Sequence, residues 1–443
     1  MTQPLFRDTI FALSSGRLPS GVAIVRLSGP QVRFVLDRMI GSVPLPRVAT
    51  VSKIFSTDGR LIDHGLVLFF RGPQSFTGED CAEFHLHGGV ATVSACLNSL
   101  GSMDGLRAAE AGEFTRRAFM NGKIDLTEAE GLSDLIAAET EAQRVQALLN
   151  AEGGQRHLYD GWRKRLIHAR AMIEAEIDFS DEDDVPGSIG SVIWTDMDLL
   201  AEDITFHVNS AHRAEIVRSG LDVVILGAPN AGKSSLMNAL AGRDVSIIAE
   251  EAGTTRDLVE VRLDIDGYRV NLVDTAGIRD NPGHVEGIGI QRAQARSANG
   301  DLILLVEDVT DGGSAPLPPY GVPCLRVGLK GDLVSGATAV HAYDVVASSL
   351  NRAGIDMLFG LLSDFVLKSI GRSSEATPIR QRQVMELNSC LDYLNCALIS
   401  GDLALELRAE ELRLAGDALS RLSGHTDVED LLDVIFSQFC VGK

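Results

Sequence analysis

The sequence has no apolar run approaching the ~20 residues that a membrane-spanning helix needs, which argues against a membrane transporter. It also has little cysteine: six residues in 443, scattered along the chain, with no C-x-x-C pair. That distribution favours reduced thiols in the cytoplasm over a disulfide framework or a zinc site. At the start of the chain no cationic segment precedes an apolar stretch, so we expect no signal peptide and a cytoplasmic protein.

The chain has fewer basic than acidic residues. Forty Lys and Arg stand against 61 Asp and Glu, which gives a formal net charge of −21. Phosphate contacts dominate nucleic-acid affinity, and a protein whose main ligand is a polyanion normally presents a basic face. We therefore expect this chain not to hold a nucleic acid tightly on its own, although a local basic patch is compatible with the net charge. The composition is that of a globular protein, and the length predicts about three domains at roughly 150 residues each.

Residues 222–235 read D-V-V-I-L-G-A-P-N-A-G-K-S-S, and the rest of the chain is organised around them. Residues 223–226 form a short apolar run that predicts a buried strand. The next residues match G-x-x-x-x-G-K-S, with Gly227, Gly232, Lys233 and Ser234 at the required places. In this motif the glycines let backbone N–H groups face phosphate oxygens, the lysine reaches the outer phosphates, and the serine hydroxyl binds Mg²⁺ at the start of a helix.

The sequence after this loop indicates a parallel α/β domain with a switch region. Gly253, Thr254 and Thr255 suit a loop that closes on Mg²⁺ and a γ-phosphate. Two alternating runs, residues 261–265 and 269–273, flank Asp266-Gly267, which is a hairpin signal. The second run leads into D-T-A-G, where Asp274 is placed to hold the Mg²⁺ shell. Apolar runs at 302–306 and 322–327 continue the strand–helix alternation of a parallel sheet.

The fourth run ends at L-K-G-D, residues 329–332, where guanine-reading loops usually carry N-K-x-D. Residues 348–350, S-S-L, are a candidate for the last base-contacting loop. In this order the motifs predict a GTPase. Leu329 replaces the usual Asn, and an intramolecular hydrogen bond contributes about 0.5–1.5 kcal/mol net. We therefore predict weaker nucleotide binding but a retained preference for GTP over ATP. Ile278 follows D-T-A-G where Ras-type enzymes use a water-orienting Gln, so another residue must position the water.

Pro229-Asn230 in the phosphate loop, G-T-T-R-D, D-T-A-G-I-R and V-E-G-I-G-I-Q-R-A together resemble the MnmE (TrmE) family of tRNA-modification GTPases. The resemblance covers essentially the whole chain. It implies that Asn230 binds K⁺, which sits where an arginine finger would otherwise neutralise charge; a desolvated cation there stabilises charge that grows between the β- and γ-phosphates. It also implies that Glu286 positions the attacking water, although without the family this carboxylate is better explained as a solvated loop residue.

The nucleotide and metal ligands that the resemblance implies cover four segments. The GTP-contacting residues are Asn230, Ala231, Gly232, Lys233, Ser234, Ser235, Ala249, Glu250, Glu251, Ala252, Gly253, Thr254, Thr255, Asp274, Thr275, Ala276, Gly277, Leu329, Lys330, Gly331 and Asp332. Among them, the expected Mg²⁺ ligands are Ser234 and Thr255, and the expected K⁺ ligands are Asn230, Ala249, Glu251 and Thr254.

Residues 1–120 have the pattern of an α+β domain, with strand-like runs at 22–29, 65–70 and 81–89. His85 and His87 share a strand face, but no third ligand stands at a metal-binding spacing, so a strand-surface role is the better reading. The motifs D-T-I-x-A, S-F-T-G-E-D, H-G-G and G-E-F-x-x-R-A-F again resemble the MnmE family. That resemblance implies a dimerising domain that binds 5-formyl-tetrahydrofolate. The positions it implies for this ligand are Arg26, Glu83, Lys123 and Lys443.

Residues 121–219 and 373–443 are predicted to form one discontinuous helical domain, with the GTPase domain of residues 220–372 inserted into it. Apolar residues recur at helical spacing, T-E-A-E at 127–130 is a predicted capping box, and a third helix is expected over 195–217. A second capping box is predicted at 426–429, and the acidic residues 181–184 form a predicted inter-helix turn. The chain ends in F-C-V-G-K, a signature of the family. Its Cys440 is either a packed thiol, as free cysteines commonly are, or the residue that the family implicates in the modification reaction.

These expectations combine into one function. The resemblance implies a homodimer that hydrolyses GTP with Mg²⁺ and K⁺. With an FAD-containing partner of the MnmG (GidA) type, it would build an aminomethyl or carboxymethylaminomethyl group on the wobble uridine of certain tRNAs. A ribosome-assembly GTPase would normally add a basic RNA-binding module, which is not visible in the sequence. A simple folate aminomethyl-transferase would not need residues 220–370.

Overall fold

The structure is a computed structural model, and it describes most of the chain. The described residues are 6–178, 189–242, 246–247, 260–274, 300–311, 321–334, 342–348, 350, 353–370, 377–378, 380–399, 404–424, 432, 435–436, 439 and 442. Contacts divide the chain into two compact units, which are Met1–Ser133 with Asn150–Met197 and Asp392–Lys443, and Asp134–Leu149 with Asp198–Leu391. The three-domain division predicted above stays a prediction.

The first unit contains a six-stranded sheet in the order β3-β4-β5-β2-β1-β6. Its strands are β1 (Thr9–Leu13), β2 (Ser20–Ser28), β3 (Thr50–Phe55), β4 (Leu61–Phe70), β5 (Cys81–Gly88) and β6 (Leu106–Ala108). All neighbours are antiparallel except β1 and β6. Alternate residues of the sheet pack under α1 (Val32–Ile40) and α2 (Val90–Gly101) in one apolar core. The three strand-like runs predicted in this region are confirmed, and α3 (Glu113–Met120) follows the sheet.

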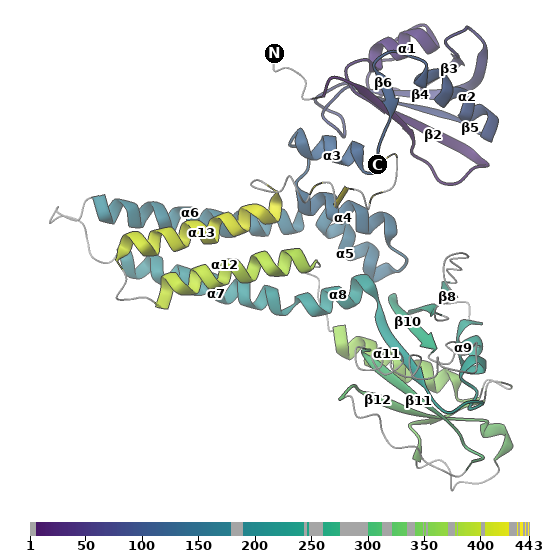
Figure 1. Cartoon of the computed structure of the whole chain (residues 1–443), viewed down its shortest axis with the longest axis vertical. Coiled ribbons are helices and arrows are strands. Elements are labelled where there is room, and N and C mark those ends of the chain that lie inside the picture. Colours follow the sequence, from purple (N-terminus) through teal and green to yellow (C-terminus); the bar gives the residue numbers. More distant parts are fainter. Residues whose placement is uncertain are drawn as a thin grey trace, which may run out of the picture. The chain divides into compact units, whose positions relative to one another are not determined.

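The helices of the first unit include α6 (Gly154–Asp178) and α13 (Leu405–Ser423), which lie side by side although far apart in the sequence (Figure 1). The capping box predicted with Thr127 as the N-cap is wrong in register. Helix α4 (Leu126–Ala137) already includes Thr127, and the residue before the helix is Asp125. The Asp125 carboxylate accepts from the backbone N–H of Glu128 at 2.8 Å, and the Glu128 carboxylate accepts from the N–H of Asp125 at 2.7 Å. Asp is as good an N-cap as Thr, and the reciprocal bonds form at this position.

The single helix predicted over 195–217 is also wrong, because the chain forms α7 (Ile189–Asn209) and then α8 (Ala211–Ser219). Ser210 interrupts the helix, and both its backbone N–H and its hydroxyl donate to the carbonyl of His207. The second predicted capping box and the acidic residues 181–184 lie outside the described residues. The remaining helices in the described chain are α5 (Glu141–Ala151), α9 (Lys233–Ala241), α11 (Ile355–Ile370) and α12 (Gln381–Ile399).

The second unit contains a seven-stranded sheet in the order β13-β12-β11-β7-β10-β9-β8. Its strands are β7 (Leu221–Leu226), β8 (Ser246–Ile247), β9 (Glu260–Ile265), β10 (Tyr268–Asp274), β11 (Leu302–Asp308), β12 (Cys324–Leu329) and β13 (Val345–Val346). Strands β10, β7, β11, β12 and β13 are parallel. Strands β9 and β10 form the predicted hairpin, and both turn residues, Asp266 and Gly267, have positive φ as a type I′ turn requires.

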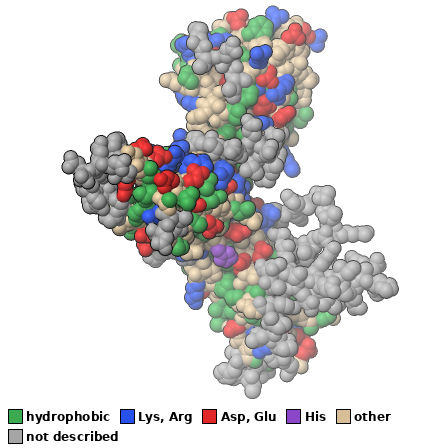
Figure 2. Space-filling model, turned by 60° about the vertical axis from the view of Figure 1, so that its left-hand side comes forward, with side chains coloured by type: hydrophobic (Ala, Val, Ile, Leu, Met, Phe, Trp, Pro, Cys, Tyr) green, Lys and Arg blue, Asp and Glu red, His purple; other side chains and the backbone are tan. Residues whose placement is uncertain are grey.

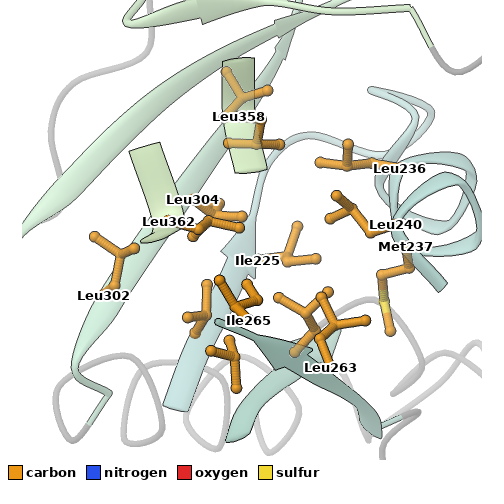
Figure 3. Close-up of a cluster of buried hydrophobic side chains, with 14 of the residues drawn as sticks. Ile225, Leu236, Met237, Leu240, Leu263, Ile265, Leu302, Leu304, Leu358 and Leu362 are labelled. Atoms are coloured by element: carbon orange, nitrogen blue, oxygen red, sulfur yellow. The ribbon is translucent and has the colours of Figure 1, made fainter. Parts of the chain in front are cut away.

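The core of the second unit joins this sheet to α9 and α11 (Figure 3). Leu236, Met237 and Leu240 on α9 point toward the strands. Leu358 and Leu362 come from α11 and belong to the same buried cluster. The core fixes the first turn of α9 relative to the carboxyl ends of β7, β11 and β12, which is the edge where a parallel α/β sheet binds its ligand.

On the face shown in Figure 2, acidic, basic and hydrophobic side chains are mixed over the described surface. Among the described helices, none combines the length and the apolarity that crossing a membrane requires.

Candidate functional site

The predicted phosphate loop connects β7 to α9. A Cβ on Gly227 would lie 2.2 Å from the Val306 carbonyl oxygen, so only glycine fits where the loop leaves the sheet. Asn230 has φ of 65° and Gly232 has φ of 98°, both in the left-handed region. Gly232 is the N-cap of α9, and Lys233 is the first helical residue. The loop therefore delivers the N-terminal end of a helix to the ligand edge of the sheet, which suits an anion.

Lys233 is held inside this loop. The residue is 7% exposed, and its Nζ donates to the carbonyl oxygens of Gly227 and Ala228, each at 2.9 Å. The ammonium group is thus fixed over the concave side of the loop, where phosphate oxygens would lie. Ser234 and Ser235 follow in the first turn of α9 and are exposed. A buried lysine ammonium group next to the backbone N–H groups of a glycine-rich loop is the set of hydrogen-bond donors that binds the phosphates of a nucleoside triphosphate.

The candidate base-reading loop lies at the end of β12. Leu329 is the last residue of that strand, and Gly331–Leu333 form a single 3-10 turn in which Asp332 is exposed. The Gly331 N–H donates to the Ala347 carbonyl at 3.2 Å, and the Ala347 N–H donates to the Gly328 carbonyl at 2.8 Å. These bonds hold the predicted base loop against Ala347, which directly precedes residues 348–350, the other segment predicted to contact the base.

Other predicted nucleotide residues are placed only in part. Asp274 ends β10 in register with Ile225 of β7, one strand away from the start of the phosphate loop. Several predicted residues lie outside the described chain: Ala249, Glu250, Glu251, Ala252, Gly253, Thr254, Thr255, Thr275, Ala276, Gly277, Glu286, Cys440 and Lys443. Their predicted roles stay predictions.

A second candidate site lies on the sheet of the first unit. Arg26 on β2 and Glu83 on β5 are register partners, and Arg26 Nε donates to Glu83 Oε1 at 3.0 Å. Both side chains are partly exposed, at 24% and 15%, and the Glu83 carboxylate also lies 3.3 Å from His85 Nε2. The predicted folate residues Arg26 and Glu83 therefore form one ion pair. Lys123 lies elsewhere on this unit, where its Nζ donates to the Pro73 carbonyl at 3.0 Å.

His85 and His87 do not converge on a common point. His85 contacts Glu83, whereas His87 Nδ1 lies 2.8 Å from Asp63 Oδ1. Within the described part of the chain, no group of three or more His, Cys, Asp or Glu side chains is arranged to hold a metal ion. The strand-surface reading of the two histidines agrees with these contacts.

Sequence reasoning missed the charge cluster at Arg117. The Arg117 guanidinium is fully buried and pairs with the carboxylates of Asp8 at 2.8 Å, Glu113 at 3.0 Å and Glu79 at 3.2 Å. Glu79 also accepts from the Ser28 hydroxyl at 2.7 Å. Glu79 belongs to S-F-T-G-E-D, and Glu113 and Arg117 belong to G-E-F-x-x-R-A-F. These motifs therefore join the 75–80 loop, β2 and α3. The available signal was the i,i+4 spacing of Glu113 and Arg117, which places two opposite charges on one face of α3.

Sequence reasoning also missed a contact to the β9–β10 hairpin. Glu139, between α4 and α5, has one carboxylate oxygen 3.1 Å from Arg262 Nη1 and the other 3.2 Å from Arg269 Nη1. The Ala142 N–H donates to the Gly267 carbonyl in the hairpin turn at 3.0 Å. In the sequence the hairpin lies between the loop predicted to close on the nucleotide, at Gly253 to Thr255, and the D-T-A-G segment that begins at Asp274, and this clamp fixes it to α5.

Comparisons with known proteins agree with this geometry. Residues 9–123 match the family described as "GTP-binding protein TrmE N-terminus", and residues 126–440 match the "MnmE helical domain" family. A protein of Chelativorans sp. (strain BNC1), "tRNA modification GTPase MnmE", is 55% identical over 437 residues, which are 99% of this chain and 98% of that protein. The protein of the same description from Brucella anthropi is also 55% identical, over the same shares of both chains.

Among solved structures, an Era variant of Aquifex aeolicus bound to GDP.AlF4- is 26% identical, with a TM-score of 0.27, over 39% of this chain and 66% of that one. The sequence resemblance inferred from the motifs is thus confirmed by relatives aligned along nearly the full length, and the phosphate loop accounts for the GTP hydrolysis that their description states. The chain belongs to the MnmE family of tRNA modification GTPases.

Proposed function

We propose that this GTPase is activated by K⁺ and acts as a homodimer in the cytoplasm. With an FAD-containing partner of the MnmG type, it would install an aminomethyl-type group on the wobble uridine of certain tRNAs. The one-carbon unit would come from 5-formyl-tetrahydrofolate. The observation that carries the proposal is the phosphate loop, in which Lys233 is fixed over a glycine-lined cradle and Asn230 stands in the left-handed region.

In this proposal the chain's own groups bind and orient the nucleotide. Lys233 and the N-terminal N–H groups of α9 hold the phosphates, and the Ser234 hydroxyl and the Asp274 carboxylate are oxygen donors of the kind that Mg²⁺ prefers. Asn230 is exposed, and its side-chain oxygen suits K⁺. When bound, the two cations neutralise charge that develops on the phosphates. Glu286 would orient the water. The Leu329–Asp332 segment would select guanine.

The one-carbon part of the proposal rests on Arg26 and Glu83. A carboxylate accepts hydrogen bonds from the donor-rich edge of a pterin, and a guanidinium pairs with carboxylates in a fixed fork geometry. In the structure the two groups neutralise each other across neighbouring strands and stay partly exposed. A ligand that offers both an N–H edge and a carboxylate would satisfy both groups.

The cation requirement is tested by measuring GTP hydrolysis in KCl and in NaCl at equal ionic strength. The wild type is expected to be much faster in KCl, and Asn230→Ala is expected to lose that difference. Asn238→Ala is the matched control, because Asn238 is an exposed asparagine on α9, the helix that follows the phosphate loop. Equal rates in the two salts for the wild type would refute the K⁺ assignment.

The folate assignment is tested by calorimetric titration of the full chain with 5-formyl-tetrahydrofolate. Glu83→Gln is expected to weaken binding, whereas Glu110→Gln, at an exposed position of the same unit, is expected to leave it unchanged. The tRNA role is tested by analysing wobble nucleosides from a strain that lacks the gene. The modified uridine should return when the wild-type chain is restored together with the flavoprotein. If nucleosides are unchanged in the deletion strain, the substrate assignment is wrong.

A further inference from the structure

The predicted base-reading loop departs from the usual pattern at Leu329, and the structure reveals what this side chain does. Leu329 is 2% exposed at the end of β12. Its Cδ1 atom would lie only 2.9 Å from a Cβ placed on Gly232, the N-cap of α9. The leucine therefore packs directly beneath the phosphate loop. An apolar contact joins the base loop to the phosphate loop at the position where an asparagine would join them by hydrogen bonds.

The packing of Leu329 against the phosphate loop does not orient the side chain of the next residue, Lys330. Lys330 is in the left-handed region, with φ of 62°, and its side chain is 39% exposed. A lysine side chain has about 2 kcal/mol of rotamer entropy to lose when it is ordered. Without a partner, its stem would sample many positions over the site where the base is expected.

Asp308 supplies that partner. It ends β11 in register with Leu329, and its carboxylate Oδ2 accepts a charge-assisted hydrogen bond from Lys330 Nζ. The other oxygen, Oδ1, accepts from the Thr310 N–H at 2.9 Å and from the Thr310 hydroxyl at 2.6 Å. Thr310 thus fixes one oxygen of the Asp308 carboxylate, and the other oxygen holds the ammonium group of Lys330. Its hydrogen bond from Lys330, followed by those from Thr310, lowers the pKa of Asp308 to about 2, so it is charged at neutral pH.

We propose that Asp308 is a positioning residue for the guanine nucleotide, because it orients Lys330 at the base site. Together with the Leu329 contact, it replaces the hydrogen bonds that an asparagine at position 329 would make between the base loop and the phosphate loop. The proposal rests on the assignment of Leu329–Asp332 as the base-reading loop. It concerns binding and acts only through Lys330.

The test measures binding of fluorescently labelled GDP, its release rate, and steady-state hydrolysis of GTP by the full chain. Asp308→Asn is expected to weaken GDP binding about 3- to 10-fold, because it removes one charge-assisted bond, mainly through faster release. The rise in KM for GTP should exceed the fall in kcat. Asp308→Glu, which keeps the charge, should bind GDP more tightly than Asp308→Asn does. Asp364→Asn is the matched control, because Asp364 is an exposed acid on α11 of the same unit.

A double-mutant comparison tests the route through Lys330. Lys330→Met and the double variant Asp308→Asn/Lys330→Met should bind GDP equally weakly, within about twofold, because both lose the same pair. Thr310→Val, which removes one bond to the carboxylate, should cause a smaller loss and tests the proposal even if Asp308→Asn does not fold. Wild-type affinity in Asp308→Asn, or losses that multiply in the double variant, would overturn the proposal.

A separate variant tests the underlying loop assignment. Asp332→Asn should lower the preference for guanine over xanthine nucleotides, since an amide offers a donor where the carboxylate only accepts. If that preference stays unchanged, the loop assignment is wrong. If the preference shifts while Asp308→Asn binds GDP normally, the loop reads the base and only the role of Asp308 is refuted.

Discussion

Replacing Arg117 by Met tests how the N-terminal sheet is held to α3 and to the 75–80 loop. Removing one partner of a buried ion pair typically costs about 3–5 kcal/mol, because an uncompensated charge is left behind. In this cluster Glu113 keeps Arg107, whose Nη2 lies 2.6 Å from Glu113 Oε1, and Glu79 keeps the hydroxyl of Ser28. The remaining partners reduce the loss, so we expect about 3 kcal/mol for Arg117→Met, the lower end of that range.

The loss should be local and pH-dependent. Burial alone raises the pKa of Asp8 and of Glu113, but hydrogen bonds and charge from Arg107 and Arg117 outweigh it and hold both pKa values below their ordinary range. A carboxyl whose folded-state pKa is lowered stabilises the fold above its unfolded-state pKa, and that stabilisation disappears as the pH falls through the folded-state value. The difference between the wild type and Arg117→Met should therefore be constant near neutral pH and shrink below about pH 4.

Hydrogen–deuterium exchange at pH 7 is the assay, because it reports opening of β2, β5 and α3 separately from the other parts of the chain. Scanning calorimetry between pH 7 and pH 3 follows the pH dependence. Arg60→Met is the control, since Arg60 and its partner Asp58 are mostly exposed, and it should leave exchange unchanged. Adding Glu79→Gln to Arg117→Met should restore part of the protection. The reasoning is refuted if Arg117→Met exchanges like the wild type, or if Glu79→Gln worsens the loss.

Three further changes test other parts of the molecule. Glu139→Gln should weaken the clamp on Arg262 and Arg269 by about 1 kcal/mol, as for a partly exposed ion pair, and speed amide exchange in the β9–β10 hairpin; unchanged exchange would exclude the clamp. Glu286→Ala should reduce GTP hydrolysis at least tenfold and leave the GTP dissociation constant within about twofold; an equal loss of both would argue against a water-positioning role. Cys440→Ser should abolish tRNA modification in cells but preserve GTP hydrolysis; retained modification would make this cysteine structural.

Local patterns were enough to predict several elements of the fold. Asp266-Gly267 predicted the hairpin correctly, because few residues tolerate two consecutive positive φ angles. The G-x-x-x-x-G-K-S pattern predicted the β7–loop–α9 unit, because its glycines are required where Gly227 meets Val306. The helix termini were predicted less well. Thr127 and Asp125 are both competent N-caps two residues apart, and only the position of Glu128 in three dimensions decides which one caps α4.

The sequence by itself determined the phosphate loop of this protein, because the residues from Gly227 to Ser234 that form it lie in one short segment of the chain. It also determined family membership, through motifs spread over the full length. Only the tertiary structure decided which distant charges meet: Arg117 with Asp8 and Glu79, Glu139 with two arginines of the hairpin, and Asp308 with Lys330. The physical reason is that an ion pair depends on a separation of a few ångströms in space, which strand order and helix packing set.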